Sequence, residues 1–153
     1  MTQEEKDLFF MREALAEAYA SAELDEVPVG AVVVFEDTVI ARAGNRRETR
    51  RCATCHAELS AIEEACRYRH GWRLPDCTLY VTLEPCPMCA GAIVNARIPR
   101  VVYGATDPKG GALGGLFDLL SQPLNHHPSV TKGVLEEECR QILSAYFKNK
   151  REK

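Results

Sequence analysis

No run of apolar residues in this sequence approaches the ~20 needed to cross a bilayer, and residues 1–7 are too polar and acidic for a secretory signal. We therefore expect a cytoplasmic protein with no membrane partner. The net charge of −3 lacks the basic excess typical of nucleic-acid-binding proteins. Segment 104–115 is rich in glycine, but it has neither the Gly-Lys-Ser/Thr ending of a P-loop nor the G-x-G-x-x-G of a dinucleotide site. We expect a mobile loop there.

Cysteine is present seven times, an odd number that does not fit a complete disulfide framework. Without an export signal, reduced thiols and metal ligation are expected instead. Cys86 and Cys89 lie three residues apart behind Pro85, which suits the first position of a helix. Both sulfurs would then project from one face of the first turn, where the helix N-terminus favours the metal-binding thiolate.

His56 and Glu58 extend this pattern. His56 would be a third protein ligand, and three ligands with an open fourth position are typical of a catalytic zinc site. Glu58 would act as the base for the bound water rather than as a ligand. Residues two apart point about 200° away from each other on a regular helix, so His56 has to lie at the start of its helix and not within it.

The spacing of apolar residues predicts helices at about 4–22, 56–71, 85–96 and 134–147. Apolar, β-branched runs predict strands at 29–35, 39–43, 79–83 and 101–104, of which the first two form a hairpin. Strands that alternate with helices indicate an α/β protein, with parallel members in a central sheet covered by helices. A chain of 153 residues suits one domain.

The pair H-x-E and P-C-x-x-C resembles the signature of the zinc-dependent nucleoside and nucleobase deaminases. Segments 56–59 and 79–92 resemble, more narrowly, the bacterial tRNA-specific adenosine deaminases. Further segments that look like this family's in order and spacing are 26–31, 44–46, 100–105, 107–110 and 125–126. The resemblance implies a three-layer α/β/α cytidine-deaminase-like fold with a central mixed five-stranded sheet. It implies one deaminase domain over 1–153, with its catalytic core at about 4–115 and a C-terminal helix at about 134–149.

The same resemblance implies hydrolytic deamination of adenosine to inosine at the wobble position of a tRNA anticodon, with an arginine tRNA as substrate and a homodimer as the active form. It implies one Zn²⁺ per chain on His56, Cys86 and Cys89, with Glu58 as proton shuttle for zinc-activated water. The substrate contacts that it implies are Val27, Asn45, Ala57, Pro85, Asp107, Lys109, Asn125, His126 and Phe147. Asn45 also fits the alternative of a turn residue before the arginine-rich segment.

Basic residues are concentrated in two places despite the acidic balance. The first cluster consists of Arg42, Arg46, Arg47, Arg50 and Arg51. The second lies beside Tyr146 and Phe147 and consists of Lys148, Lys150, Arg151 and Lys153. Both could hold RNA phosphates while aromatic rings stack on bases. Alternatively, they are a solvated loop and a helix end favoured by the helix dipole.

Three other interpretations compete with the tRNA enzyme. A guanine deaminase, or another nucleobase or nucleotide deaminase, would use the same zinc ligands without needing the C-terminal cluster. Cys52 and Cys55 form a second C-x-x-C, so a structural zinc module of four cysteines is a non-enzymatic alternative. Its spacer exceeds the usual ~15–20 residues, and it gives Glu58 no role. The C-x-x-C-H string also matches c-type haem attachment, but we expect no haem because attachment follows export. Cys66, Cys77 and Cys139 are expected in the core.

Overall fold

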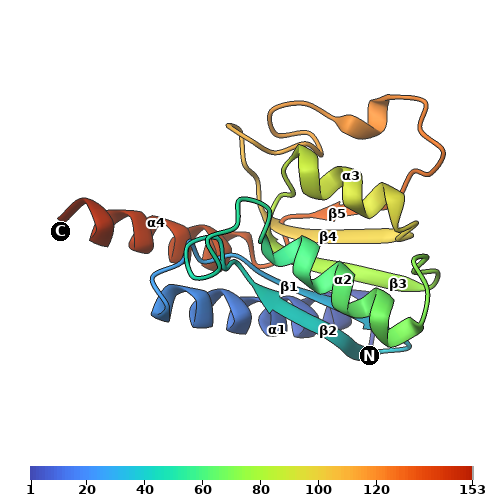
Figure 1. Cartoon of the computed structure of the whole chain (residues 1–153), viewed down its shortest axis with the longest axis horizontal. Helices are drawn as coiled ribbons and strands as arrows, with labels where there is room; N and C mark the ends of the chain where they lie inside the picture. Colours follow the sequence, from blue (N-terminus) through green and yellow to red (C-terminus); the bar gives the residue numbers. More distant parts are fainter. Residues whose placement is uncertain (153) are drawn as a thin grey trace.

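The computed structural model describes residues 1–152, and the side chains of residues 1–151; Lys153 of the C-terminal basic cluster lies outside this range. Among the described residues, five strands form a mixed sheet with the order β2-β1-β3-β4-β5 (Figure 1). The strands are β1 (Gly30–Phe35), β2 (Thr38–Gly44), β3 (Cys77–Leu83), β4 (Arg100–Ala105) and β5 (Ser129–Lys132). β1 pairs antiparallel with β2 and β3, whereas β3, β4 and β5 are mutually parallel.

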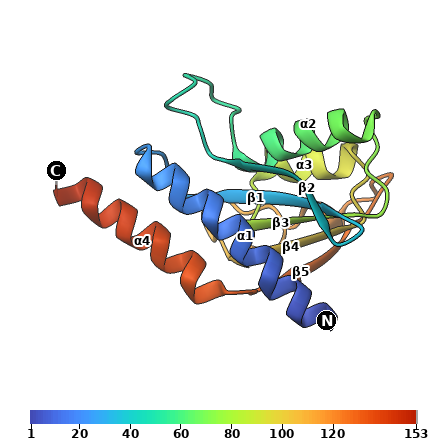
Figure 2. The ribbon, with the colours of Figure 1, turned by 90° about the horizontal axis from the view of Figure 1, so that it is seen from below.

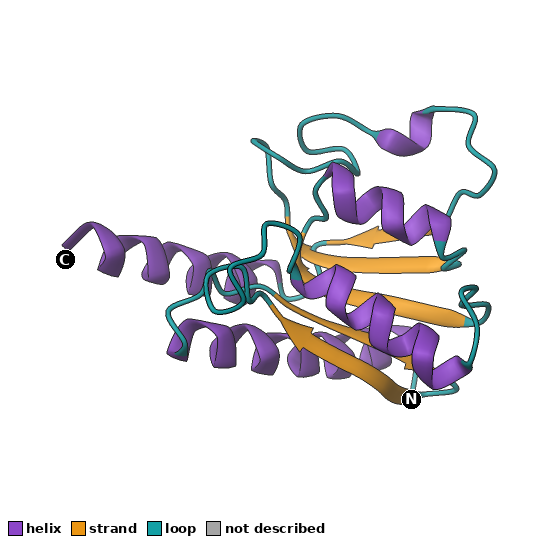
Figure 3. Ribbon diagram, viewed as in Figure 1, coloured by secondary structure: helices purple, strands orange, loops and turns teal. Residues whose placement is uncertain are grey.

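Helices cover both faces of the sheet. They are α1 (Gln3–Glu23), α2 (Ala57–Arg69), α3 (Pro87–Asn95) and α4 (Glu136–Glu152), with a short 3-10 helix η1 (Leu119–Ser121). Figures 2 and 3 show α1 and α4 on one face and α2 and α3 on the other. The expected three-layer fold with a mixed five-stranded sheet is therefore confirmed. Within residues 1–152, every helix is too short or too polar to cross a bilayer.

The strand β1, which lies between β2 and β3, contributes to both halves of the core. Ala31 and Val33 pack with residues of α2 and α3, whereas Val32 and Val34 pack with residues of α1. This alternation follows from the two-residue period of a strand. Burial on both faces explains why the sequence of β1 is an almost continuous apolar run rather than an alternating one.

The predicted hairpin is confirmed, and Glu36 and Asp37 form its turn with positive φ angles of 51° and 59°. The predicted start of α3 at Pro85 is wrong, because the helix begins at Pro87 with Cys86 as its N-cap. A residue that precedes proline is pushed out of the helical region, which keeps Cys86 extended. The sequence analysis also did not locate β5. Its residues are mostly polar and mostly exposed, so it has no apolar run.

Candidate active site

Six segments meet at one edge of the sheet. The parallel strands β3 and β4 end there, the antiparallel strand β1 begins there, and β2 ends beside it. The N-termini of α2 and α3 lie at the same edge. α3 starts soon after β3 ends, whereas the segment between β2 and α2 is longer and returns to the edge through the hydrogen bond from the Arg46 N–H to the Cys55 carbonyl. Open α/β sheets bind ligands outside the carboxyl ends of their parallel strands. The predicted histidine and cysteines all fall on these helix starts.

His56 is the N-cap of α2 with extended backbone angles (φ −76°, ψ 152°), so its predicted position at the start of the helix is confirmed. Its Nδ1 atom lies 3.6 Å from Cys86 Sγ and 3.5 Å from Cys89 Sγ. Within the described chain, these three residues form the group whose ligand atoms lie within 4.8 Å of one another, so they could hold a metal ion. Cys52 and Cys55 are not part of it, and the four-cysteine alternative is therefore wrong.

The pKa values of Cys86 and Cys89 shift in opposite directions. The hydrogen bond from Cys89, aided by the one to His56, lowers the pKa of Cys86 to about 3. The same hydrogen bond and burial raise the pKa of Cys89. The N-terminus of α3 adds partial positive charge that favours thiolate at both positions. Because metal ligands must be deprotonated, a divalent cation would release the thiol proton of Cys89 and gain two thiolate ligands.

A cavity of about 180 Å³ opens beside this group. It is lined by Val27, Val29, Asn45, Arg47, His56, Ala57, Glu58, Leu83, Glu84, Cys86 and Asp107. Glu58 is only 4% exposed, and burial raises its pKa to about 7 although its own backbone N–H and His56 favour the charged form. A carboxyl group with that pKa can both take up and release a proton near neutral pH.

Asn45 lies in the cavity wall and also has structural partners. Its Nδ2 donates to the Val27 carbonyl at 3.2 Å, and its Oδ1 accepts from the Arg47 N–H at 3.3 Å. These contacts agree with the turn-residue interpretation. They also fix the amide at the surface of the cavity, so the two interpretations of Asn45 are compatible.

Several of the predicted substrate contacts do not line the cavity. Pro85 is buried, and its carbonyl accepts from the Ala112 N–H at 2.9 Å. Lys109 and Asn125 are exposed. The His126 ring donates from Nε2 to the Ile98 carbonyl at 2.6 Å, which places it near the start of β4, whereas the cavity lies beyond the end of that strand. The structure therefore does not bring His126 to the metal-binding group.

Phe147 lies on α4, near a second depression rather than in the cavity. This groove of about 460 Å³ is lined by residues of α4, of the segment before β1 and of the segment after β2. From α4 it includes Tyr146 and Lys150, and it shares Val27, Asn45 and Arg47 with the cavity. Phe147 is 43% exposed beside Tyr146, whose ring centroid is 5.4 Å away. The groove and the cavity therefore adjoin, with three lining residues in common.

Glu84 is a residue that the sequence analysis missed. It is 2% exposed, and its carboxylate accepts N–H groups from Asp107 (3.0 Å), Leu113 (2.9 Å) and Gly115 (2.8 Å). A Cβ at Gly111 or at Gly115 would come within 2.4 Å of this carboxylate, so the loop needs glycine for its close approach. In the structure this loop is held against the cavity by three hydrogen bonds to the buried Glu84 side chain, and its expected mobility stays a prediction. The apolar neighbours of Glu84 in the sequence indicate that it is buried, but they do not indicate its hydrogen-bond partners.

A family model of the MafB19-like deaminases matches residues 5–151 of this chain. The fold and the metal-binding group are accordingly those of a deaminase, a class of enzyme. The tRNA-specific adenosine deaminase of Bacillus subtilis (strain 168) is 53% identical over 154 residues, which cover all of this chain and 94% of the relative. The chain belongs to the family of tRNA-specific adenosine deaminases.

Solved structures agree with this placement. A tRNA:A34 deaminase, from work on A-to-I editing at the wobble position of transfer RNA, matches with a TM-score of 0.84 and 50% identity. The match covers 88% of this chain and 99% of that one. The guanine deaminase from Bacillus subtilis is more distant, with a TM-score of 0.63 and 38% identity over 69% of this chain and 66% of its own.

Proposed function

We propose that this enzyme deaminates adenosine to inosine at the wobble position of a tRNA anticodon. The observation that carries the proposal is the buried Glu58 carboxyl, which lines the same cavity as the metal-binding group. The likeness to tRNA-specific adenosine deaminases over the whole chain supports the choice of substrate. By the same likeness, we take an arginine tRNA as the substrate to test, and we place the activity in the cytoplasm, where tRNA resides.

Zn²⁺ is the ion that fits His56, Cys86 and Cys89. Zinc prefers tetrahedral nitrogen and sulfur ligands, with Zn–N of about 2.0–2.1 Å and Zn–S of about 2.3 Å, which separates the nitrogen from each sulfur by about 3.6 Å. The observed separations of 3.5 and 3.6 Å match this value. Three protein ligands leave one position for water, and a bound Zn²⁺ would acidify that water and so supply the nucleophile.

Glu58 would move the protons. Its carboxylate takes a proton from the attacking water and passes it to the ring nitrogen next to the target carbon, which makes that carbon electrophilic. It then carries the second proton to the amino group, which leaves as ammonia. Water and adenosine are thereby converted to ammonia and inosine. The N–H of Ala57, at the start of α2, and the amide of Asn45 would hold the base, which their position in the cavity lining supports.

The dimensions of the site suit one extruded base. A cavity of about 180 Å³ is smaller than the ~300–1,000 Å³ of sites for drug-sized ligands. A nucleotide in an anticodon loop is already partly unstacked, so moving it into the cavity costs little. The adjoining groove, with Arg47 and Lys150 at its sides, would then take neighbouring parts of the loop.

We also propose a homodimer as the active form. Leu116 and Phe117, which follow the cavity wall, are 59% and 43% exposed. A symmetric contact between two copies would cover such apolar side chains and join their basic surfaces. Sedimentation of the active preparation tests this, because a monomer at the concentration of the assay would contradict it.

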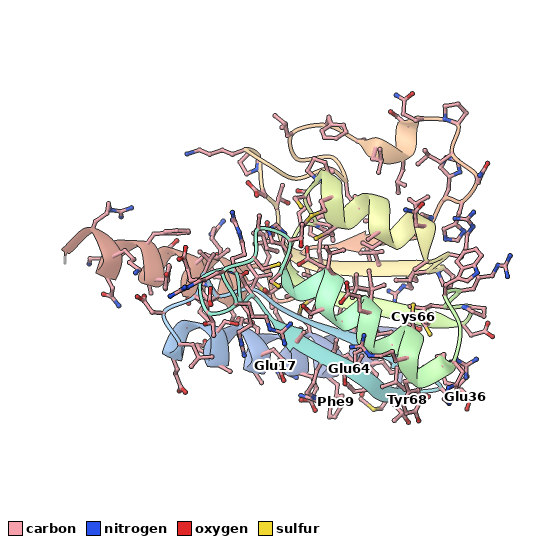
Figure 4. The ribbon with its side chains drawn as sticks, viewed as in Figure 1. Phe9, Glu17, Glu36, Glu64, Cys66 and Tyr68 are labelled. Atoms are coloured by element: carbon pink, nitrogen blue, oxygen red, sulfur yellow. The ribbon has the colours of Figure 1, made fainter. Side chains whose placement is uncertain are left out.

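The first experiment incubates the zinc-loaded protein with an arginine tRNA anticodon stem-loop that carries adenosine at the wobble position. We expect inosine to form, and Glu58→Gln to lower the rate by about 10²–10⁴-fold while one zinc per chain is retained. Glu64→Gln is the matched control, because Glu64 projects from the exposed side of the same helix (Figure 4). It should leave the rate unchanged.

Activity on other substrates distinguishes the tRNA deaminase from the guanine deaminase alternative. Free adenosine and guanine should not be converted. Guanine conversion without stem-loop conversion would favour the guanine deaminase alternative, which the likeness to the solved guanine deaminase supports. Full activity of Glu58→Gln on any substrate would contradict the proposed proton transfer.

A further inference from the structure

The segment between β2 and α2 contains a second pair of cysteines that the metal-binding group does not use. Cys52 and Cys55 lie just before His56, in a segment that projects from the body of the molecule (Figure 2). Two backbone hydrogen bonds close its base, from the Arg46 N–H to the Cys55 carbonyl and from the Cys52 N–H to the Arg47 carbonyl, both at 3.0 Å. The dithiol is therefore held in an ordered segment.

The backbone places Cys52 and Cys55 at the two ends of a turn. The Cys55 N–H donates to the Cys52 carbonyl at 3.3 Å, and residues 53–54 form the turn between them. Such a turn keeps the two Cα atoms within about 7 Å of each other. Disulfides span Cα separations of about 4.4–6.8 Å, so a bond between these cysteines needs little movement of the segment.

The two thiols also interact and can be reached from solvent. The Cys55 thiol donates to Cys52, and Thr54 adds a contact at 3.4 Å, which together lower the pKa of Cys52 to about 7. Both residues are half-buried. By contrast, burial raises the pKa of Cys77 to about 11 and that of Cys139 to about 12. Cys52 is thus the stronger nucleophile at neutral pH, since thiolates rather than thiols attack disulfides.

We propose that Cys52 and Cys55 form a reversible redox site that exchanges with low-molecular-weight disulfides such as oxidised glutathione. The Cys52 thiolate attacks one sulfur of glutathione disulfide, whose S–S bond breaks and releases one glutathione thiolate. The Cys55 thiol then loses its proton and attacks Cys52, which forms the intramolecular bond and expels the second glutathione. Two protein thiols are oxidised, and one glutathione disulfide is reduced to two thiols.

The position of this site connects it to the cavity. The same segment carries Arg47, which lines both the cavity and the adjoining groove, and it ends on His56. A bond between Cys52 and Cys55 therefore closes a four-residue turn in a segment that borders both depressions. Cys86 and Cys89 would be held by the metal and are not part of the exchange. The proposal does not depend on which substrate the enzyme takes.

The test incubates the full-length, zinc-loaded protein with oxidised glutathione at neutral pH, blocks free thiols and digests with trypsin. Cleavage after Arg51 and Arg67 leaves Cys52, Cys55 and Cys66 in one peptide. We expect this peptide to carry one blocking group, on Cys66, and to be about 2 Da lighter than the same peptide with Cys52 and Cys55 as free thiols, because the new bond has cost two hydrogens that dithiothreitol restores. Zinc per chain should not change.

Single variants separate the roles of the three cysteines. Cys66→Ser should still form the bond, because Cys66 lies toward the far end of α2 (Figure 4). Cys55→Ser should stop at a mixed disulfide with glutathione on Cys52, and Cys52→Ser should react about tenfold more slowly than the wild type. A wild-type protein that keeps glutathione on Cys52, that does not react, or that loses zinc through oxidation of Cys86 and Cys89 would overturn the proposal.

Discussion

The Glu84 carboxylate holds three N–H groups of one loop on two oxygens. Oε1 accepts from Asp107, whereas Oε2 accepts from both Leu113 and Gly115. Glutamine has one oxygen and one NH₂ group, so one side of it must present a donor to backbone donors. The less costly orientation keeps the two bonds at Oε2 and gives up the bond to Asp107, which is the partner that lines the cavity.

We predict that Glu84→Gln raises KM for the stem-loop about tenfold and destabilises the fold by about 1–3 kcal/mol, since it leaves a buried N–H unpaired. kcat should fall much less, and zinc content should stay the same, because the metal ligands do not touch this carboxylate. Steady-state kinetics, chemical denaturation and metal analysis of one preparation measure all three quantities.

Asp7→Asn is the matched control for this variant. Asp7 is another buried carboxylate, 5% exposed, but it lies on α1 across the sheet from the cavity and accepts from Tyr80 at 2.7 Å. Its replacement should lower stability without raising KM. An equal rise of KM in both variants would mean that Glu84 acts only through the stability of the whole fold.

Some residues of a site can be predicted from the sequence by their chemistry, whereas others leave no local pattern. The proposed zinc ligands and Glu58 could be predicted because ligand type and spacing at a helix start are local properties. Glu84 could not, because its partners lie 23–31 positions away and are backbone groups of any residue type. The hydrogen bond of His126 to the Ile98 carbonyl is likewise a tertiary contact without a local pattern, and its role as a substrate contact stays a prediction.

At the scale of elements, α4 connects the C-terminal basic cluster to the groove. The Tyr146 hydroxyl donates to the Asp25 carbonyl at 3.1 Å, and Lys150 Nζ lies 2.7 Å from Asp25 Oδ2. These contacts fix the last turns of the helix beside the segment that leads into β1. Phe147, Lys148 and Arg151 are exposed there, where they could contact bases and phosphates.

We predict that truncation after Ala145 raises KM for the stem-loop about tenfold or more, because stacking on an aromatic ring contributes ~1–3 kcal/mol per base. kcat should change little, since the cavity and the metal ligands lie outside α4. Kinetics at two salt concentrations measure this effect, and the truncated enzyme should show the weaker salt dependence because it has lost phosphate contacts.

Truncation after Lys150 is the control, because it keeps both contacts to Asp25, Phe147 and half of the basic cluster. It should behave nearly like the full chain. If truncation after Ala145 also left KM unchanged, α4 would have no part in RNA binding, and the solvated-helix interpretation of its basic residues would hold.

Element boundaries could be predicted where a local rule sets them and not elsewhere. The ends of α1 lie within one residue of the prediction, since capping and apolar period agree there. The predicted start of α3 was two residues too early. Pro85 and Pro87 both suit a first helical position, and the sequence pattern does not show that the extended N-cap is Cys86, directly before Pro87. β5 depends on pairing with β4 and has little apolar pattern of its own.

Across the whole molecule, one polar network ties α1 to three strands. The Arg100 guanidinium on β4 donates to both Asp7 oxygens at 2.8 and 2.7 Å, and it also donates to Thr131 on β5 at 3.0 Å. Tyr80 on β3 donates to the same carboxylate. Because the network joins an N-terminal helix to the late strands of the sheet, its loss should affect the cooperative unfolding of the whole fold.

This network makes stability depend on pH in the acid range. Burial acts to raise the pKa of Asp7, but the hydrogen bonds from Arg100 and Tyr80 outweigh it and lower the pKa below its usual value. The carboxylate therefore contributes its full stability above its unfolded pKa of ~3.9, and this contribution is lost as the pH falls through the lower folded pKa.

We predict that Asp7→Asn costs about 3 kcal/mol at neutral pH, because it leaves Arg100 without its charged partner, and that the difference from wild type shrinks below pH ~4. Urea denaturation of both proteins between pH 7 and pH 3 measures the difference. Asp37→Asn, which removes an exposed partner of Lys6, should show almost none. A difference that stayed constant with pH would mean that Asp7 stabilises the fold by shape and hydrogen bonding alone, with no contribution from its charge.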